Sequence, residues 1–354
     1  MSSIPAFLPW QDEVAKRWLG TRNRFAHAWL IHGLKGIGKR QFALAAAASL
    51  LCEAPKDGLA CGTCSACQWL ASGNHPDLRL VRPDAVAHEE GGAGQAAEEG
   101  TDASVNASAS KKAPSKDIRV DQLRSLSTWF NTATHRGGWR VAVLYPAESL
   151  NLVSANALLK VLEEPPEHTV FLLVADAPDR LLPTLVSRCR RLPLAVPDQR
   201  RCLEWLEAQG VQNAASWLAA AGGAPVLAQQ QAQLHAHPYP EWLTLVLDSM
   251  ALGNGADIGP VADQLEKQAA EVWIDVLQRL FFDLLLAGSG STVRYFPDLA
   301  KKIGATASRA DLTELTQMCR WLAEQRRIAA HPLNAKLFVH STLQRAAMAG
   351  RALS

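Results

Sequence analysis

The segment 33–40 (GLKGIGKR) has the spacing of a phosphate-binding loop, but its last residue is the wrong type. The working pattern is G-x-x-x-x-G-K-[ST], and Gly33, Gly38 and Lys39 supply the two glycines and the lysine. The glycines let backbone N–H groups surround phosphates, the lysine reaches the outer phosphates, and the final hydroxyl ligates Mg²⁺. Arg40 replaces that hydroxyl, and a guanidinium cannot ligate a metal. The loop predicts a residual ATP pocket without a magnesium seat.

The second magnesium contact of such a pocket is also missing. A nucleotide-hydrolysing enzyme of this kind carries Asp-Glu after another buried strand, where the Asp holds Mg²⁺ and the Glu acts on the attacking water. Here the corresponding strand is followed by Tyr145 and Pro146, and Glu148 comes too late to replace either carboxylate. Because both metal contacts are wrong, we expect that the chain hydrolyses no nucleotide. An ATPase with unusual metal ligation is the alternative.

Four closely spaced cysteines follow the phosphate-binding loop: Cys52, Cys61, Cys64 and Cys67. Zn²⁺ binds four thiolates tetrahedrally, and the short C-x2-C steps place sulfurs on one side of a turn. Four protein ligands leave no open coordination position, so the expected Zn²⁺ is structural rather than catalytic. The remaining cysteines are scattered and are predicted to be packing residues.

Arg188 lies in the motif Ser187-Arg188-Cys189, where a predicted helix runs into the next strand. An arginine at such an edge can enter the active site of a neighbouring subunit and stabilise charge on a phosphoryl group in transfer. On spacing alone, the alternative interpretation is a plain basic edge made of Arg188, Arg190 and Arg191, and spacing favours it.

Alternating strand and helix patterns predict an α/β fold up to about residue 195. Apolar runs predict buried strands at 28–32, 77–81, 140–145, 169–175 and 191–196. Strands that alternate with helices indicate a parallel sheet with helices on both faces. Residues 84–117 are small, polar and aperiodic, which is typical of a disordered insertion or surface loop. Beyond Pro197 only helical patterns remain, including a single long helix expected over 261–286 and two later helices at 311–329 and 334–347.

Composition limits the classes of function. The chain has 354 residues, 48% of them hydrophobic, which is enough for two or three domains. A formal net charge of +2 is too balanced for tight binding of nucleic acid by charge alone. No apolar run reaches the ~18 residues of a membrane span, and the N-terminus lacks a signal-peptide pattern. We therefore expect a cytoplasmic protein.

Two further segments resemble hallmark motifs of bacterial clamp-loader subunits, which belong to the AAA+ family. They are residues 156–166 (NALLKVLEEPP) and 181–189 (LLPTLVSRC). The cysteine module after the loop helix and the start of the last helix, 334–337 (NAKL), are also similar to that family. The resemblance covers nearly the whole chain, and the segment 156–166 is highly specific.

The nucleotide site departs from that of the ATP-hydrolysing gamma/tau subunits and resembles that of a non-hydrolysing member of the family. The resemblance aligns Tyr145 and Pro146 with the Asp-Glu pair, and Ala175 and Asp176 with the sensor threonines. Pro225 falls where the motor subunits carry a second sensor arginine. Lys39, in contrast, is the residue that a nucleotide-binding loop requires, and its presence leaves nucleotide binding open.

For the fold, the resemblance implies three parts. Residues 1–195 would form a RecA-like AAA+ α/β domain with a parallel sheet, a zinc module at 52–67 and a disordered insertion at 84–117. Residues 196–235 would form a small helical lid, and residues 236–354 an all-α collar domain that joins subunits into a ring.

For function, the resemblance implies a rigid stator subunit with no ATPase activity of its own, within a DNA-directed DNA polymerase holoenzyme, a nucleotidyltransferase complex. Arg188 would act in trans on the ATP site of a neighbouring gamma/tau subunit. The implied partners are the gamma/tau and delta subunits in a hetero-pentamer, the sliding clamp, and primer–template DNA contacted through the complex. The expected location is the cytoplasmic, nucleoid-associated replisome. A motor-type clamp-loader ATPase and a zinc-dependent DNA-binding protein are the alternatives.

Overall fold

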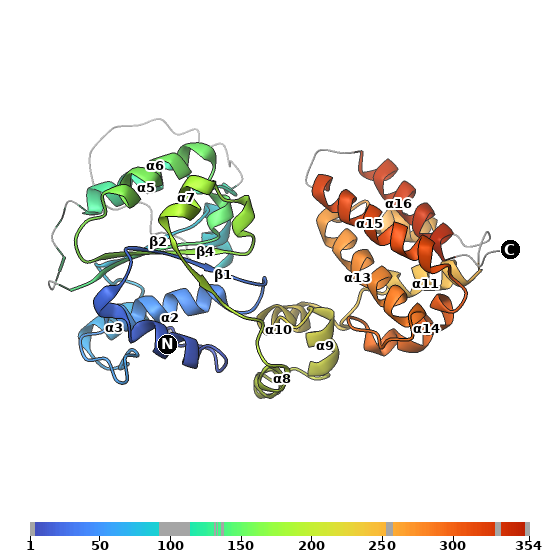
Figure 1. Cartoon of the computed structure of the whole chain (residues 1–354), viewed down its shortest axis with the longest axis horizontal. Helices are drawn as coiled ribbons and strands as arrows, with labels where there is room; N and C mark the ends of the chain where they lie inside the picture. Colours follow the sequence, from blue (N-terminus) through green and yellow to red (C-terminus); the bar gives the residue numbers. More distant parts are fainter. Residues whose placement is uncertain are drawn as a thin grey trace. The chain divides into compact units, whose positions relative to one another are not determined.

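The computed structural model in Figure 1 describes residues 4–91, 114–130, 132, 134–135, 138–252, 258–329 and 334–350. Contacts divide the chain into two compact units, Met1–Asp198 and Gln199–Ser354. This division lies close to the boundary expected at residue 195. The further separation of a lid from a collar at residue 235 stays a prediction.

The first unit is built on a five-stranded sheet with the order β2-β3-β4-β1-β5, in which every neighbouring pair is parallel. All residues of β3 and β4 are buried, because helices cover both faces of a parallel sheet and its central strands need continuous apolar runs. The α/β fold and its strands are confirmed, with these bounds: β1 Ala28–His32, β2 Leu78–Val81, β3 Arg140–Leu144, β4 Thr169–Ala175 and β5 Arg190–Pro193.

Helices lie on both faces of this sheet. Figure 1 shows α5, α6 and α7 on one face, and α2 and α3 on the other. Leu126 of α5, Leu162 of α6 and Leu185 of α7 belong to one buried apolar cluster with the central strands. The helices of this unit are α1 Asp12–Leu19, α2 Lys39–Leu51, α3 Ser65–Ala71, α4 Asp84–Glu89, α5 Val120–Phe130, α6 Leu152–Glu163 and α7 Pro183–Arg188.

The segment expected to be a disordered insertion is folded at both ends. Its first residues form helix α4, Asp84–Glu89. Its two ends are tied together, because the backbone N–H of Ala85 donates to the carbonyl of Ser115 at 3.0 Å and Arg119 pairs with Asp84 at 3.3 Å. The interpretation of 84–117 as disordered is therefore corrected at its ends, and residues 92–113 lie outside the described part.

The second unit contains only helices among its described residues. A single buried cluster joins Trp242 of α11, Leu280 of α13 and Leu322 of α15. No described helix has both the length and the apolar character needed to cross a bilayer. The bounds are α8 Gln199–Ala208, α9 Ala214–Ala220, α10 Pro225–Leu234, α11 Trp242–Leu252, α12 Gly259–Leu265, α13 Ala270–Gly288, α14 Ala300–Ala307, α15 Leu312–Ile328 and α16 Ala335–Ala349.

The expectation of one long helix over 261–286 is wrong. Helix α12 ends at Leu265 and α13 begins at Ala270, because Ala269 between them has an extended backbone (φ −61°, ψ 129°). The two later helices are confirmed. Their starts are fixed by side-chain caps, since Asp311 accepts the backbone N–H of Thr313 and Asn334 accepts that of Leu337.

Candidate functional site

The phosphate-binding loop connects the end of β1 to the start of α2, as its motif requires. Gly36 and Gly38 have left-handed backbones with φ of 81° and 88°, a conformation that glycine adopts without strain. Gly33 is needed for a different reason, because a Cβ atom there would lie 2.4 Å from the carbonyl oxygen of Leu194. The glycines therefore give the loop the shape of a phosphate cradle.

Contacts within the chain use every hydrogen-bond donor of the loop lysine. Lys39 is only 4% exposed, and its Nζ donates to the carbonyl oxygens of Gly33 at 2.9 Å and Leu34 at 2.6 Å. Its third partner is Asp176, whose Oδ1 lies 2.6 Å from Nζ. An ammonium has three N–H donors, so these contacts use all of them. Asp176 directly follows β4, which pairs with β1, and this brings its carboxylate to the loop.

The two residues at the magnesium positions meet around a third residue, Glu90. One Glu90 carboxylate oxygen lies 3.1 Å from Nη2 of Arg40, and the other accepts the hydroxyl of Tyr145 at 2.9 Å. Arg82 closes the cluster, with its Nε 3.2 Å from Glu90 and its Nη1 donating to the Tyr145 hydroxyl at 2.9 Å. Burial raises the pKa of Tyr145, so its hydroxyl stays a neutral donor. A ring of direct contacts thus joins the positions where an ATPase binds metal.

The N-terminal segment braces the same loop from another side. The side-chain amide of Gln11, which is 2% exposed, donates to the carbonyl of Gly38 at 2.8 Å. The indole N–H of Trp10 donates to the carbonyl of Ile37 at 3.0 Å. The predicted pocket residues are therefore together, but sequence reasoning missed Gln11, Glu90 and the pairing of Asp176, because none of them lies in the loop motif.

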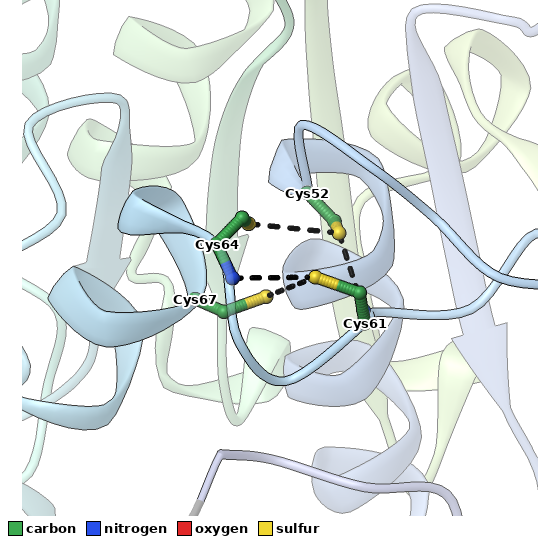
Figure 2. A group of neighbouring side chains, drawn as sticks. All are labelled: Cys52, Cys61, Cys64 and Cys67. Atoms are coloured by element: carbon green, nitrogen blue, oxygen red, sulfur yellow. Dashed lines mark hydrogen bonds between the residues drawn. The ribbon is translucent and has the colours of Figure 1, made fainter.

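The four predicted cysteines converge at the other end of α2 (Figure 2). Their sulfur atoms all lie within 4.8 Å of one another. The Sγ atoms of Cys52 and Cys64 are 3.8 Å apart, and those of Cys61 and Cys67 are 3.9 Å apart. Four sulfurs at about 2.3 Å from a tetrahedral Zn²⁺ would be separated by about 3.8 Å, so the set fits zinc.

The local environment shifts the pKa values of Cys61 and Cys67 in opposite directions. Hydrogen bonds from the backbone N–H groups of Thr63 and Cys64 lower the pKa of Cys61 to about 5. Burial raises the pKa of Cys67 to about 12. Since thiolates are the ligands, a metal ion bound here has to displace the proton from Cys67, and acid opposes its binding.

Arg188 is the last residue of α7, and its side chain remains 35% exposed. Its Nη1 donates to the carbonyl of Thr184 at 2.9 Å, and its Nη2 pairs with Oε1 of Glu163 on α6 at 2.5 Å. The next residue, Cys189, is buried, and burial raises the pKa of its thiol to about 12, which suits a packing residue. The contact with Glu163 was not foreseen from the sequence.

The parallel sheet, the degenerate phosphate-binding loop and the cysteine cluster after α2 define an AAA+-like domain of the clamp-loader class. Residues 13–198 match the family described as "DNA polymerase III, delta subunit". The chain is 33% identical over 342 residues to the DNA polymerase III subunit delta' of Pseudomonas aeruginosa, with 92% of each chain covered. The chain therefore belongs to the delta-prime subunits of the DNA polymerase III clamp loader.

Two other relatives match a little over half of the chain. The subunit delta' of Yersinia pestis is 34% identical over 203 residues, which cover 57% of this chain and 52% of the relative. The subunit tau of Escherichia coli is 30% identical over 184 residues, which cover 52% of this chain and 24% of tau. The chain is thus related in sequence both to delta-prime subunits and to tau.

Proposed function

We propose that this chain is a stator of the clamp loader. It hydrolyses no ATP and supplies Arg188 to the ATP site of a neighbouring gamma/tau subunit while the sliding clamp is loaded on primed DNA. The observation that carries the proposal is the internal closure of the nucleotide pocket. Carboxylates of the chain hold the loop lysine and the arginine at the magnesium position, through Asp176 and Glu90.

The lack of ATPase activity follows from the chemistry of phosphoryl transfer. In such reactions Mg²⁺ bridges the β- and γ-phosphates and neutralises the charge that develops. Here Arg40 and Tyr145 replace the metal ligands, and both contact Glu90. Bound ATP would have to displace Asp176 from Lys39 and would bring its phosphates close to the Asp176 carboxylate, so like charges would repel.

The finger role rests on the donors that Arg188 retains. A guanidinium carries five N–H donors, and the contacts with Thr184 and Glu163 use one on each terminal nitrogen. Within the described part of the chain no contact uses the other donors, which can make a planar, bidentate contact with phosphate oxygens. Such a group, aimed at a phosphoryl group in transfer, stabilises the charge of the transition state.

The partners follow from membership of the family. We infer assembly with gamma/tau and delta subunits in a hetero-pentamer, and contact with the clamp and primer–template DNA through that assembly. A formal net charge of +2 agrees with DNA contacts that are shared among subunits. We also infer that the cysteine cluster holds one structural Zn²⁺, because four thiolates complete its coordination.

Arg188→Ala tests the finger directly. In the reconstituted complex, single-turnover hydrolysis at the ATP site that adjoins this chain should slow by about 10³-fold, the lower end of the effect of an arginine finger. Arg188→Lys should recover little, because lysine keeps the charge and loses the planar fork. Assembly, measured by size-exclusion chromatography, should not change. An unchanged hydrolysis rate would remove Arg188 from this role.

The alternative is an ATP-hydrolysing motor subunit of the gamma/tau type. The observation in its favour is that Gly33, Gly38 and Lys39 are all present and correctly arranged. Turnover of Mg-ATP by the purified chain separates the two functions. The stator should show none, whereas sustained phosphate release without any other subunit would identify a motor.

A further inference from the structure

We propose that Glu163 is a positioning residue for the Arg188 finger. The inference rests on the proposed function, since it assigns a task to the partner of the finger. Glu163 lies outside the Ser-Arg-Cys motif, on a different helix from Arg188, and is 25 residues away in sequence. Nevertheless its Oε1 lies 2.5 Å from Nη2 of the finger.

Both residues of this contact are attached to helices that pack into the core. Glu163 is the final residue of α6, and its neighbour Leu162 is 2% exposed in the core. Helix α6 cannot continue much further, because Pro165 and Pro166 follow and the residue before a proline disfavours the helical backbone. On the other side, Leu185 of α7 is fully buried in the same core, less than one turn before Arg188.

The contact fixes the guanidinium from one side. The backbone carbonyl of Thr184 accepts from Nη1, and Glu163 accepts from Nη2, so each terminal nitrogen has one anchored donor. An arginine side chain has many rotamers, and a neighbouring active site would otherwise have to restrict them during the reaction. Orienting the group beforehand lowers that cost and keeps it near the productive geometry.

The exposure of the pair separates this role from a structural one. The side chains of Arg188 and Glu163 are 35% and 50% exposed, and an ion pair in this setting adds little to folding stability because solvent screens it. The loss of Glu163 should therefore change the rate of the neighbouring reaction far more than the stability of this chain. A mainly structural contact would show the reverse.

The experiment compares Glu163→Ala, Glu163→Gln and the control Glu164→Gln in the reconstituted complex. Glu163→Ala should lower kcat at the adjoining ATP site by up to about 10²-fold, the cost that a misplacement of about 1 Å can carry, with KM for ATP unchanged. Glu163→Gln keeps an oxygen acceptor and should recover most of the rate. Glu164 is the exposed neighbour of Glu163, and its variant should match the wild type.

A double-mutant cycle isolates the effect on the finger. In the Arg188→Ala background, Glu163→Ala should cause no further loss, because the group that it positions is gone. An equal loss in that background would overturn the inference, and so would an unchanged or faster rate with Glu163→Ala alone. If Arg188→Ala itself has no effect, the proposed function fails. If Arg188→Ala slows hydrolysis and Glu163→Ala does not, only the positioning role fails.

Discussion

Each end of helix α2 places groups of unfavourable charge beside the helix dipole, and the two ends differ in what compensates that charge. The N-terminus of a helix has partial positive charge, yet Lys39 and Arg40 add cations there. The C-terminus has partial negative charge, yet Cys52 begins a cluster of cysteines there whose sulfurs must become thiolates to bind a metal. At the first end, Asp176 and Glu90 supply the opposite charge from within the chain.

At the second end, the sulfur atoms have no such internal partner among the contacts found in the described residues. Those contacts come from N–H groups, a threonine hydroxyl and the sulfurs themselves. A metal cation is the charge that would complete this end. The comparison teaches that the need of a site for an external ligand depends on its internal counter-charges. Motif spacing alone does not show it.

The largest expected effect is at the cysteine end. Cys64→Ser keeps the size of the side chain and removes one thiolate, so the proposed Zn²⁺ should no longer bind. The free energy of unfolding should fall by about 4 kcal/mol, the stabilisation given by a ligand at roughly 1,000 times its Kd. Metal content by mass spectrometry and urea denaturation measure the two effects. Cys319→Ser, in the second unit, is the matched control.

Acid should act on the same end in the same direction. A proton competes with the metal for each sulfur, and without metal the pKa of Cys67 is about 12. Zinc should therefore be retained at neutral pH and released as the pH falls. Wild-type protein that contains no zinc after purification in metal-replete medium would show that the two ends of α2 do not differ in the way described.

A smaller effect is expected at the other end from Glu90→Gln. The variant removes the charge that pairs with Arg82, whose side chain is only 15% exposed, and with the more exposed Arg40. The free energy of unfolding should fall by about 1–3 kcal/mol, the usual cost of leaving a partly buried charged group without its partner. Urea denaturation with an unchanged m value measures it, and Glu89→Gln is the exposed neighbouring control. Equal stability of the two variants would show that the ring around Tyr145 does not hold this end.

The smallest effect on stability is expected from Asp176→Asn. The Asp176 side chain is 41% exposed, so losing its charge should change the free energy of unfolding by less than about 1 kcal/mol. The variant should instead gain weak binding of inorganic triphosphate, since the ammonium of Lys39 is released from a carboxylate. Isothermal titration compares it with the wild type and with the exposed control Asp179→Asn. Triphosphate binding of equal strength in all three proteins would contradict internal closure.

Sequence patterns predicted the parts of the molecule that depend on neighbouring residues. Buried strands, the loop glycines and the cysteine spacing are all local features, and the structure confirms where they lie. The contacts of Glu90 with Tyr145 and of Glu163 with Arg188 span 55 and 25 residues. Periodicity reports which face of an element is buried, but it does not report which polar side chains meet across the fold.

The broken helix shows the same limit inside one segment. Residues on both sides of the break, such as Leu265 and Trp273, are buried in the same core, so apolar spacing continues through it. The break itself depends on the extended backbone of Ala269, and alanine is a residue that favours helix. Apolar spacing therefore gives no signal of the turn at this position.

Gly33 has a consequence for how such chains are recognised. Because Gly33 has no side chain, the carbonyl of Leu194 can lie close to its backbone. Leu194 directly follows the edge strand β5, and a larger residue at position 33 would collide with this carbonyl. A protein that never meets a nucleotide would still require glycine here, because the two neighbouring chain segments approach so closely. Surveys that count ATP-binding proteins by their glycine signatures would thus include this chain for a reason of backbone clearance.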